Sequence, residues 1–406
     1  MSGPLEGIKV LDMSRVLAGP WAGQLLADLG ARVIKIEHPS RGDDTRGWGP
    51  PWLADDLENK QSEREKVAAY YLCANRGKHS LAVDIATAEG QALVRRLAAE
   101  SDILVENFKV GGLARYGLDY ASLHAENPRL IGCSITGFGQ DGPYAHRAGY
   151  DFMIQAMGGL MSLTGEADAM PMKTGVAITD VMTGLYATVG VLAALQERSR
   201  TGVGCHVDVA LLDVQVATLA NQALNTLVSG RDPERHGNAH PNIVPYQAFA
   251  CADGHLVLTV GNDAQFARFA ALLGHPEWAQ DPAYATNAAR VGNREVLVTL
   301  IQAILVTRSR DEWLVELEAR GIPAGPINSV SEAFADPQVQ HRGMRRVLKR
   351  GELEVPQVAN PLRFDGTSAT SELAPPRLGQ DSDALLAEMG LTAEDIARLR
   401  KAGVVR

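Results

Sequence analysis

The sequence predicts an α/β protein with a larger domain built on an open, Rossmann-like parallel sheet and a smaller α/β domain. The first observation is a β-α-β unit within about the first forty residues. The second is that strand-like and helix-like segments go on alternating as far as residue 198. The third is size. At roughly 150 residues per domain, 406 residues suffice for two or three domains, and 46% hydrophobic residues supply ample core.

The elements of the larger domain follow from the spacing of apolar residues. The first unit consists of a strand at 8–12, a helix at 21–29 and a strand at 32–37. Further strands are expected at 80–84, 103–105, 130–135 and 177–178, and helices at 87–100, near 118–127 and at 181–197. Because the two kinds of element alternate, we expect helices on both faces of the sheet, in a domain spanning residues 1–198.

The pattern changes after residue 198. Residues 199–229 are expected to form a linker helix. A strand pair at 246–251 and 255–260 encloses an Asp-Gly turn and belongs to a smaller domain over residues 230–325. Residues 326–406 hold short strands and turns and end in a helical region at 383–400.

Composition excludes several classes of protein. The chain has 39 basic and 48 acidic residues, a net charge of −9, so it lacks the positive field that attracts nucleic acid. Its four cysteines contain no C-x-x-C pair, which argues against a disulfide framework and a thiolate zinc site. The first residues lack the features of a signal peptide, so we expect a cytoplasmic protein. The longest apolar stretch, 181–195, is interrupted by threonine and glycine and is too short to span a bilayer, so no membrane association is expected.

Several common kinds of site are disfavoured. The turn at 14–23 has no G-x-G-x-x-G and places Trp21 where a pyrophosphate would approach, so nicotinamide binding is disfavoured even though Glu37 closes the second strand. His236 and His240 have helical spacing, but Gly237 and Pro241 indicate a loop, and no metal site is expected. No serine-hydrolase elbow or P-loop motif occurs.

Basic residues gather in turns next to predicted strands. They are Arg46, Arg76, Lys78, Lys109 and Arg115. Loops at strand ends are where open α/β sheets bind ligands, so these side chains are suited to a phosphorylated ligand. Ion pairs at the surface explain them equally well.

Asp180 lies at the start of the apolar helix. A helix cap is the usual role of an aspartate there. The position also permits chemistry, because helix-end N–H groups favour the ionised carboxylate and the apolar run keeps water scarce. Such a carboxylate is a competent nucleophile toward an activated acyl group.

Several segments together resemble the class III CoA-transferases, the family of formyl-CoA and carnitine CoA-transferases. The segments are VLAGP (16–20), LGARVIKIE (29–37), GDDTR (42–46), VENF (105–108) and DVMTG (180–184). The resemblance runs from about residue 5 to residue 380, in the family's order.

The resemblance implies that Asp180 is the catalytic residue. It would attack an acyl-CoA thioester to give an aspartyl anhydride, which CoA thiolate converts to an aspartyl-CoA thioester open to the acceptor acid. CoA and acyl-CoA are then substrates, and no permanently bound cofactor or metal is required.

The resemblance also assigns the CoA site and, less specifically, the acceptor site. Asn107, Phe108 and Arg115 match positions lining the CoA site; Arg76, Lys78, His38, Thr136 and Phe138 are further candidates. The candidate substrate-binding residues for the acceptor are Arg15, Leu17, Arg46 and His240. A second carboxylate of the acceptor needs a positive or hydrogen-bonding group, which Arg15, Arg46, His236 or His240 can supply.

The substrates are inferred from departures within the family. Leu17, His38 and Thr136 stand where formyl-CoA transferases carry Gln, Arg and Lys, and their tetraglycine loop has no counterpart. Segments 46–51, 134–140, 148–151 and 243–249 resemble the succinyl-CoA:glutarate branch. We therefore expect succinyl-CoA as donor and a dicarboxylic acid such as glutarate as acceptor.

Two alternatives stay open. An α-methylacyl-CoA racemase would share the fold, but it needs an imidazole where this chain has Tyr150, whose phenol is a poor acid/base near neutral pH. The other alternative is a non-catalytic CoA-binding protein. The resemblance further implies that residues 326–406 return to the larger domain and that the chain forms an interlocked homodimer.

Overall fold

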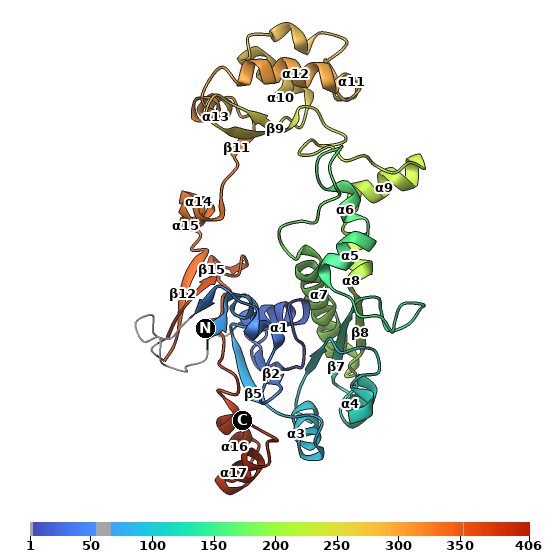
Figure 1. Ribbon diagram of the computed structural model, residues 1–406, viewed down its shortest axis with the longest axis vertical. Coiled ribbons are helices and arrows are strands. Elements are labelled where there is room, and N and C mark those ends of the chain that lie inside the picture. The colour runs from blue at the N-terminus through green and yellow to red at the C-terminus, as the bar shows by residue number, and fades with distance from the viewer. Residues whose placement is uncertain (1–2, 54–65, 352) are drawn as a thin grey trace. The chain divides into compact units, whose positions relative to one another are not determined.

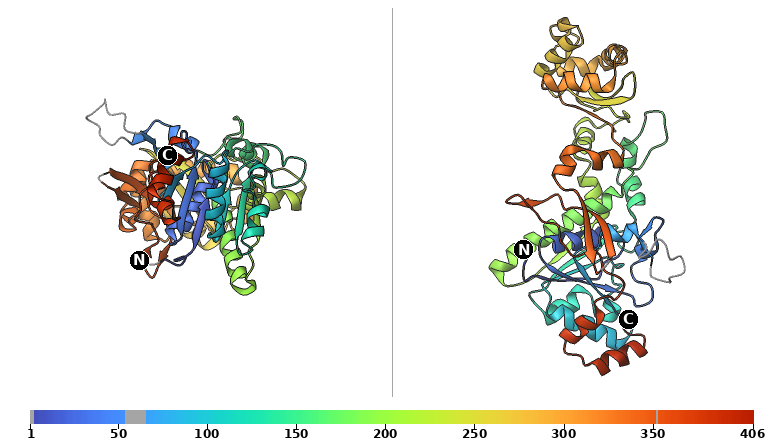
Figure 2. Two further views of the ribbon diagram at one scale, coloured as in Figure 1. Left: turned by 90° about the horizontal axis from the view of Figure 1, so that it is seen from below. Right: turned by 90° about the vertical axis from the view of Figure 1, so that its left-hand side faces the viewer.

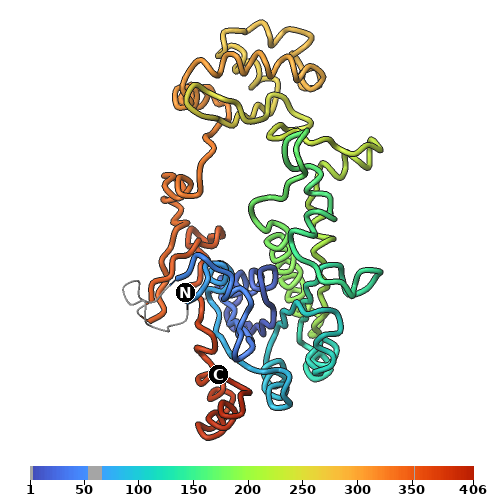
Figure 3. Tube along the Cα trace, viewed as in Figure 1, coloured from blue at the N-terminus to red at the C-terminus, as the bar shows by residue number. Residues whose placement is uncertain are grey.

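The computed structural model describes residues 3–53, 66–351 and 353–406, which form two compact units. Unit 1 comprises Met1–Leu160, Thr174–Ala223 and Pro337–Arg406, and unit 2 comprises Met161–Lys173 and Leu224–Asp336. Figure 3 follows the chain in colour, with most of unit 2 in yellow and orange. Both ends of the chain belong to unit 1.

Unit 1 contains a six-stranded sheet in which every neighbouring pair is parallel. In spatial order its strands are β5 (Lys78–Ala82), β2 (Arg32–Glu37), β1 (Lys9–Asp12), β6 (Ile103–Glu106), β7 (Ile131–Thr136) and β8 (His206–Ala210). The direction of winding reverses between β1 and β6, so the carboxyl ends of these strands flank a crevice of the kind that binds ligands in open α/β sheets. The predicted mixed α/β fold with a parallel sheet is confirmed.

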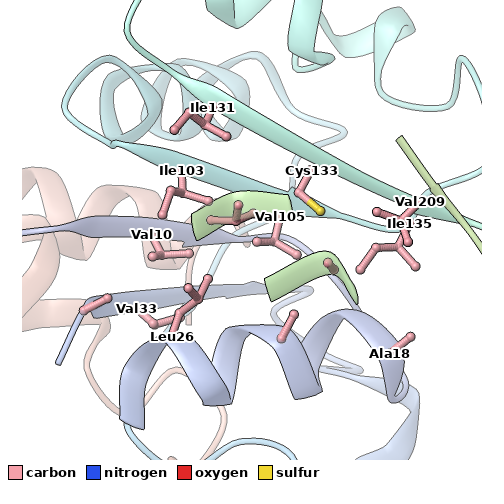
Figure 4. Packing of buried hydrophobic residues seen from close by; sticks show 14 of the residues in the cluster. Val10, Ala18, Leu26, Val33, Ile103, Val105, Ile131, Cys133, Ile135 and Val209 are labelled. Atoms are coloured by element: carbon pink, nitrogen blue, oxygen red, sulfur yellow. The ribbon is translucent and has the colours of Figure 1, made fainter. Parts of the chain in front are cut away.

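Helices cover both faces of this sheet because its strands are apolar on both sides (Figures 1 and 2). Val10 of β1 packs with α1 (Ala18–Asp28) and α7 (Ile178–Thr201) on one face, where Figure 4 shows Leu26 of α1 beneath the strands. Its neighbour Leu11 packs on the other face. That face is covered by α3 (Ala88–Ala99), α4 (Tyr120–Glu126), α16 (Ser382–Glu388) and α17 (Ala393–Lys401).

Helix α7 is longer than the sequence indicates. Its 24 residues make it, among the described residues, the one helix long and apolar enough to cross a membrane, so the expectation that it is too short is wrong. It nevertheless packs in the core through Ala187, Val191 and Ala194. A Cβ on Gly184 would lie 2.7 Å from the carbonyl oxygen of Ala18, so this glycine lets α7 approach α1 closely.

Two secondary-structure predictions are wrong. The strand expected at 177–178 is the entry to α7, because these residues precede a continuous helical pattern with no strand partner within the described sheet. The segment 199–229 is not one linker helix, since it contains β8, α8 (Leu211–Ala217) and α9 (Ala220–Ser229). Strand β8 pairs with β7 and is the last strand of the sheet.

The shorter elements belong to unit 1, except α14, which is in unit 2, and α6, which contains residues of both units. They are η1 (Asp44–Gly47), β3 (Trp52–Leu53), β4 (Val67–Ala68), α2 (Ala69–Leu72), η2 (Ala114–Tyr116), α5 (Asp151–Met157), α6 (Leu160–Leu163), α14 (Val330–Ala335), α15 (Pro337–His341), β12 (Arg345–Arg350), β13 (Leu353–Val358), β14 (Arg363–Phe364) and β15 (Thr367–Ser368).

Unit 2 is built on an antiparallel sheet of β9 (Tyr246–Ala250), β10 (His255–Thr259) and β11 (Ala324–Pro326). The predicted strand pair is thus present. Its helical elements are α10 (Asp263–Leu272), η3 (Pro276–Ala279), α11 (Asn287–Gly292), α12 (Arg294–Leu305) and α13 (Arg310–Ala319). Phe249, Phe266 and Trp313 are buried in its core.

Candidate active site

A cavity of about 540 Å³ lies at the carboxyl ends of the parallel strands in unit 1. Its wall is formed by the residues that follow β1, β2, β5 and β6, which is where the reversal of strand order places a ligand site. His38, Phe108 and Arg115, all predicted to contact CoA, line this cavity. Arg41 and Lys109 line it as well.

The larger cavity is suited to an anionic ligand. Two of its acidic residues are neutralised within the protein, since Glu37 binds Arg46 at 2.7 Å and Asp43 binds Lys35 at 2.9 Å. Arg15, Arg41, Lys109 and Arg115 add positive charge to the wall and outnumber its two other acidic residues, Asp44 and Asp84. Asp44 lies 3.6 Å from Arg15. Guanidinium and ammonium groups at strand ends are the donors that phosphate groups require.

A second cavity, of about 190 Å³, contains Asp180. It is lined by residues 15–18 after β1, 107–110 after β6 and 135–137 at the end of β7, together with Ala145, 147–150 and Leu211. The predicted site residues Leu17, Asn107 and Thr136 lie in this wall. Arg15, Asp44, Phe108 and Lys109 line both cavities, so the two are neighbours.

Asp180 is in the first turn of α7 but does not cap it. The N–H groups of Thr179 and Asp180 both donate to Oδ1 of Asp151, at 2.9 and 3.2 Å. Asp151 therefore caps the helix, and the expected capping role of Asp180 is wrong. The Asp180 side chain is only 8% exposed, and no donor of residues 3–53, 66–351 or 353–406 bonds to its carboxylate.

The carboxyl group of Asp180 has a pKa near neutral pH. Burial and, second, the negative charge of Asp151 raise the pKa of Asp180 to about 7. The opposite effect was expected, because helix-end N–H groups stabilise a carboxylate; here they bind Asp151 instead. Burial and, second, the charge of Asp180 raise the pKa of the Tyr70 phenol to about 12.

Asn107 shapes the site through the backbone of Arg15. Its Oδ1 accepts the N–H of Arg15 at 2.8 Å, and its Nδ2 donates to the Arg15 carbonyl at 2.6 Å. The Arg15 guanidinium lies 5.2 Å from the centre of the Phe108 ring and 3.6 Å from Asp44. The ends of β1 and β6 are thereby joined at the mouth of both cavities.

Three predicted basic residues are not in either cavity. Arg76 binds Asp28 at 2.6 Å, Lys78 binds Asp12 at 2.8 Å, and Arg46 binds Glu37. Lys78 is fully buried, and the other two guanidinium groups are largely so. All three belong to ion pairs inside the protein, so the explanation by surface ion pairs is wrong, and their role as ligand donors stays a prediction.

Two further predicted residues lie elsewhere. Phe138 packs edge-on against Tyr144, 5.5 Å between ring centres, and is not in the wall of either cavity. His240 belongs to unit 2, where its Nδ1 accepts the N–H of Asn242. Thr136 is in the smaller cavity, but its hydroxyl accepts the N–H of Gly139 at 2.8 Å.

Sequence reasoning missed Asp151, Tyr70 and Arg147. Asp151 belongs to the segment 148–151 that carries the family resemblance, and nothing in local spacing relates it to a helix that begins at Ile178. Tyr70 precedes no predicted strand. Arg147, which lines the smaller cavity, lies in a turn with no strand next to it in the predicted order.

Comparisons with known proteins show the family to which the chain belongs. The model of the CoA-transferase family III matches residues 5–382. The chain is 52% identical over 95% of its length, and 96% of the relative's, to "Succinate--glutarate CoA-transferase" of Agrobacterium fabrum. It is 42% identical to "Succinyl-CoA:glutarate CoA-transferase" of Homo sapiens, over 99% of this chain and 90% of that one.

A solved structure agrees at the level of the fold. The crystal structure of a CAIB/BAIF family protein from Brucella suis superposes with a TM-score of 0.84 and 51% sequence identity, covering 96% of this chain and 100% of that one. A parallel sheet with a cationic cavity beside a buried aspartate, and a family match over most of the chain, lead to one conclusion: the protein belongs to CoA-transferase family III.

Proposed function

We propose that this enzyme transfers CoA from succinyl-CoA to a dicarboxylic acid such as glutarate, with Asp180 as the nucleophile. The relatives named above act on these substrates, which supports the choice of donor and acceptor. The observation that carries the assignment of Asp180 is its position, buried in a small cavity that shares four residues of its wall with a larger, cationic one.

The larger cavity would hold the phosphates of CoA and the smaller one the thioester. In the first step a carboxylate oxygen of Asp180 attacks the thioester carbon, the C–S bond breaks, and CoA thiolate leaves an aspartyl–succinyl anhydride. The thiolate then attacks the aspartyl carbon, releasing succinate and forming an aspartyl-CoA thioester. Each step exchanges one activated acyl group for another.

The acceptor completes the cycle. A carboxylate of glutarate attacks the aspartyl-CoA thioester and releases thiolate, which then attacks the glutaryl carbon of the new anhydride. Glutaryl-CoA leaves, and Asp180 is again a free carboxylate. Arg15 and Arg147 line the smaller cavity and are suited to the acceptor's second carboxylate, Arg15 from the end of β1.

Burial serves this chemistry in two ways. A carboxylate with a raised pKa is a stronger nucleophile than an exposed aspartate, provided that it is ionised. The restricted volume of the cavity also limits the water that would hydrolyse the anhydride.

We also infer an interlocked homodimer in a cytoplasmic setting. Leu224, Leu227 and Val228 of α9 are 56, 78 and 84% exposed, an apolar surface that a partner subunit would cover. The cysteines of the described chain are free, two of them exposed, which suits a reducing compartment. Light scattering of the purified protein tests the dimer, and a monomer at micromolar concentration would contradict it.

The test of the activity is a panel of acceptors with succinyl-CoA, followed by mass spectrometry of the CoA species. We expect glutaryl-CoA to form faster than the thioesters of monocarboxylic acids of equal length. Quenching with hydroxylamine during turnover should modify Asp180. Deuterium exchange at the α-carbon of a methylacyl-CoA, without CoA transfer, would favour the racemase, and CoA binding without either reaction would favour the non-catalytic alternative.

A further inference from the structure

Val16 has a backbone conformation that its side chain disfavours. Its φ is +72°, in the left-handed region, where a β-branched residue is a strained exception. Such a residue persists only when its surroundings hold it, and strain of this kind is concentrated at functional sites. Val16 lies in the wall of the smaller cavity, between Arg15 and the start of α1.

The side chains of four residues hold the backbone around Val16. The N–H of Ser14 donates to Asp12 Oδ1 at 2.9 Å, and the Ser14 carbonyl accepts from Lys35 Nζ at 2.7 Å. Both backbone groups of Arg15 are bound by Asn107. The N–H of Val16 itself points to Oδ1 of Asp43, at 3.3 Å.

Asp43 can do this only as a carboxylate. All of its partners are donors, because Oδ1 also accepts from the N–H and the hydroxyl of Thr45, at 3.0 and 2.7 Å, and Oδ2 lies 2.9 Å from the ammonium of Lys35. Both side chains of this ion pair have no exposed surface. Although burial opposes it, the charge of Lys35 keeps the pKa of Asp43 below its ordinary value.

We propose that the buried Lys35–Asp43 ion pair is a positioning device for the reaction, which holds Val16 in the left-handed conformation so that residues 15–18 face Asp180. Lys35 is in neither cavity wall, and Asp43 lies in the wall of the larger cavity with only 1% of its surface exposed. The pair therefore acts through the turn, and not as a catalytic residue. This inference rests on the proposed function of Asp180.

The first variant is Asp43→Asn. An amide cannot replace the carboxylate, because its nitrogen must face either the Lys35 ammonium or the donors of Val16 and Thr45. Displacement of the turn should lower kcat by about 10- to 100-fold, as misplaced groups in active sites do. The KM for succinyl-CoA should change less than kcat, because Lys109 and Arg115 in the wall of the larger cavity lie outside the displaced turn, although Arg15 belongs to both.

The decisive comparison adds Val16→Gly. Glycine adopts a positive φ without strain, so the turn no longer needs Asp43 to enforce it. Asp43→Asn should therefore lower kcat less when residue 16 is glycine than when it is valine. The fold-loss of kcat in the Val16→Gly background should be at least about fivefold smaller than the fold-loss in the wild type. Thr45→Val, which removes one donor to Asp43, should show the same dependence with a smaller effect and serves if Asp43→Asn does not fold.

Asp28→Asn is the matched control. Asp28 is a buried partner of Arg76 in the same unit and lies in neither cavity wall, so this variant should lower Tm but leave kcat per folded enzyme and its dependence on Val16 unchanged. Equal loss of kcat with valine or glycine at position 16 would overturn the inference. If the wild type transfers CoA to no acid of the panel, the proposed function fails instead, which is a separate result.

Discussion

Unit 1 contains two groups of buried carboxylates that experience opposite environments. In the first β-α-β unit, Asp12, Glu37 and Asp43 each contact a buried cation, and the pKa of each is lowered because the cations outweigh the effect of burial. In the smaller cavity Asp180 has Asp151 as its charged neighbour, and its pKa rises to about 7. The same residue type is thus structural where a cation accompanies it and reactive where an anion does.

Of the variants that test this contrast, Asp180→Asn should change the rate of CoA transfer most. Without the nucleophile, CoA transfer should fall by at least about 10³-fold, while binding of free CoA, measured by calorimetry, stays within the range of the wild type because the larger cavity is untouched.

The control for this variant is Asp213→Asn, in the first turn of α8 and exposed. It should leave the rate unchanged. Substantial turnover by Asp180→Asn would remove Asp180 from the mechanism.

Lys78→Met tests the first group of carboxylates and should lower the free energy of unfolding. It leaves Asp12 buried with one cation fewer, and loss of one partner of a buried pair costs about 3–5 kcal/mol. Urea unfolding measures this cost. Lys9→Met, which removes the exposed pair with Glu100, should cost no more than about 1 kcal/mol; similar losses for the two variants would contradict the contrast.

Stability should respond in the opposite direction at the reactive carboxylate. The folded-state pKa of Asp180 is raised from 3.8 to about 7, so folding is opposed increasingly as pH rises through this interval and by the full amount above it. Asp180→Asn should therefore stabilise the protein by about 2–4 kcal/mol at pH 8.

The gain should be smaller at pH 5, where the folded protein keeps most of its proton on Asp180. Denaturant titrations of both proteins at the two pH values test this sign. A loss of stability at pH 8 would show that the carboxylate is stabilised in the fold.

Asp151→Asn should give the smallest effect and sharpen the comparison. CoA transfer in the wild type should rise with pH with a midpoint near 7, because only ionised Asp180 attacks. Removing the neighbouring charge should lower that midpoint by about one pH unit. The asparagine oxygen can still cap α7, so the helix should be retained. An unchanged midpoint in the pH–rate profile would show that the charge of Asp151 does not raise the pKa of Asp180.

Much of the parallel sheet was predictable because its strands carry their own pattern. The strand at 32–37 is predicted with its observed limits, and the helix over 87–100 is within one residue of α3 (Ala88–Ala99) at each end. β8 was missed because its membership of the sheet depends on pairing with β7, which is far away in the sequence. The boundaries predicted for the domains stay predictions.

The sequence by itself determined the fold class, the family and the position of Asp180 at the start of an apolar helix, since periodicity and ordered motifs are local. Only the tertiary structure decided which charged groups pair with one another. Arg46, Arg76 and Lys78 form buried ion pairs, and Asp151 accepts the helix-end N–H groups that Asp180 was expected to bind. Charges act over distances in space, and a linear pattern does not state which of them the fold brings together.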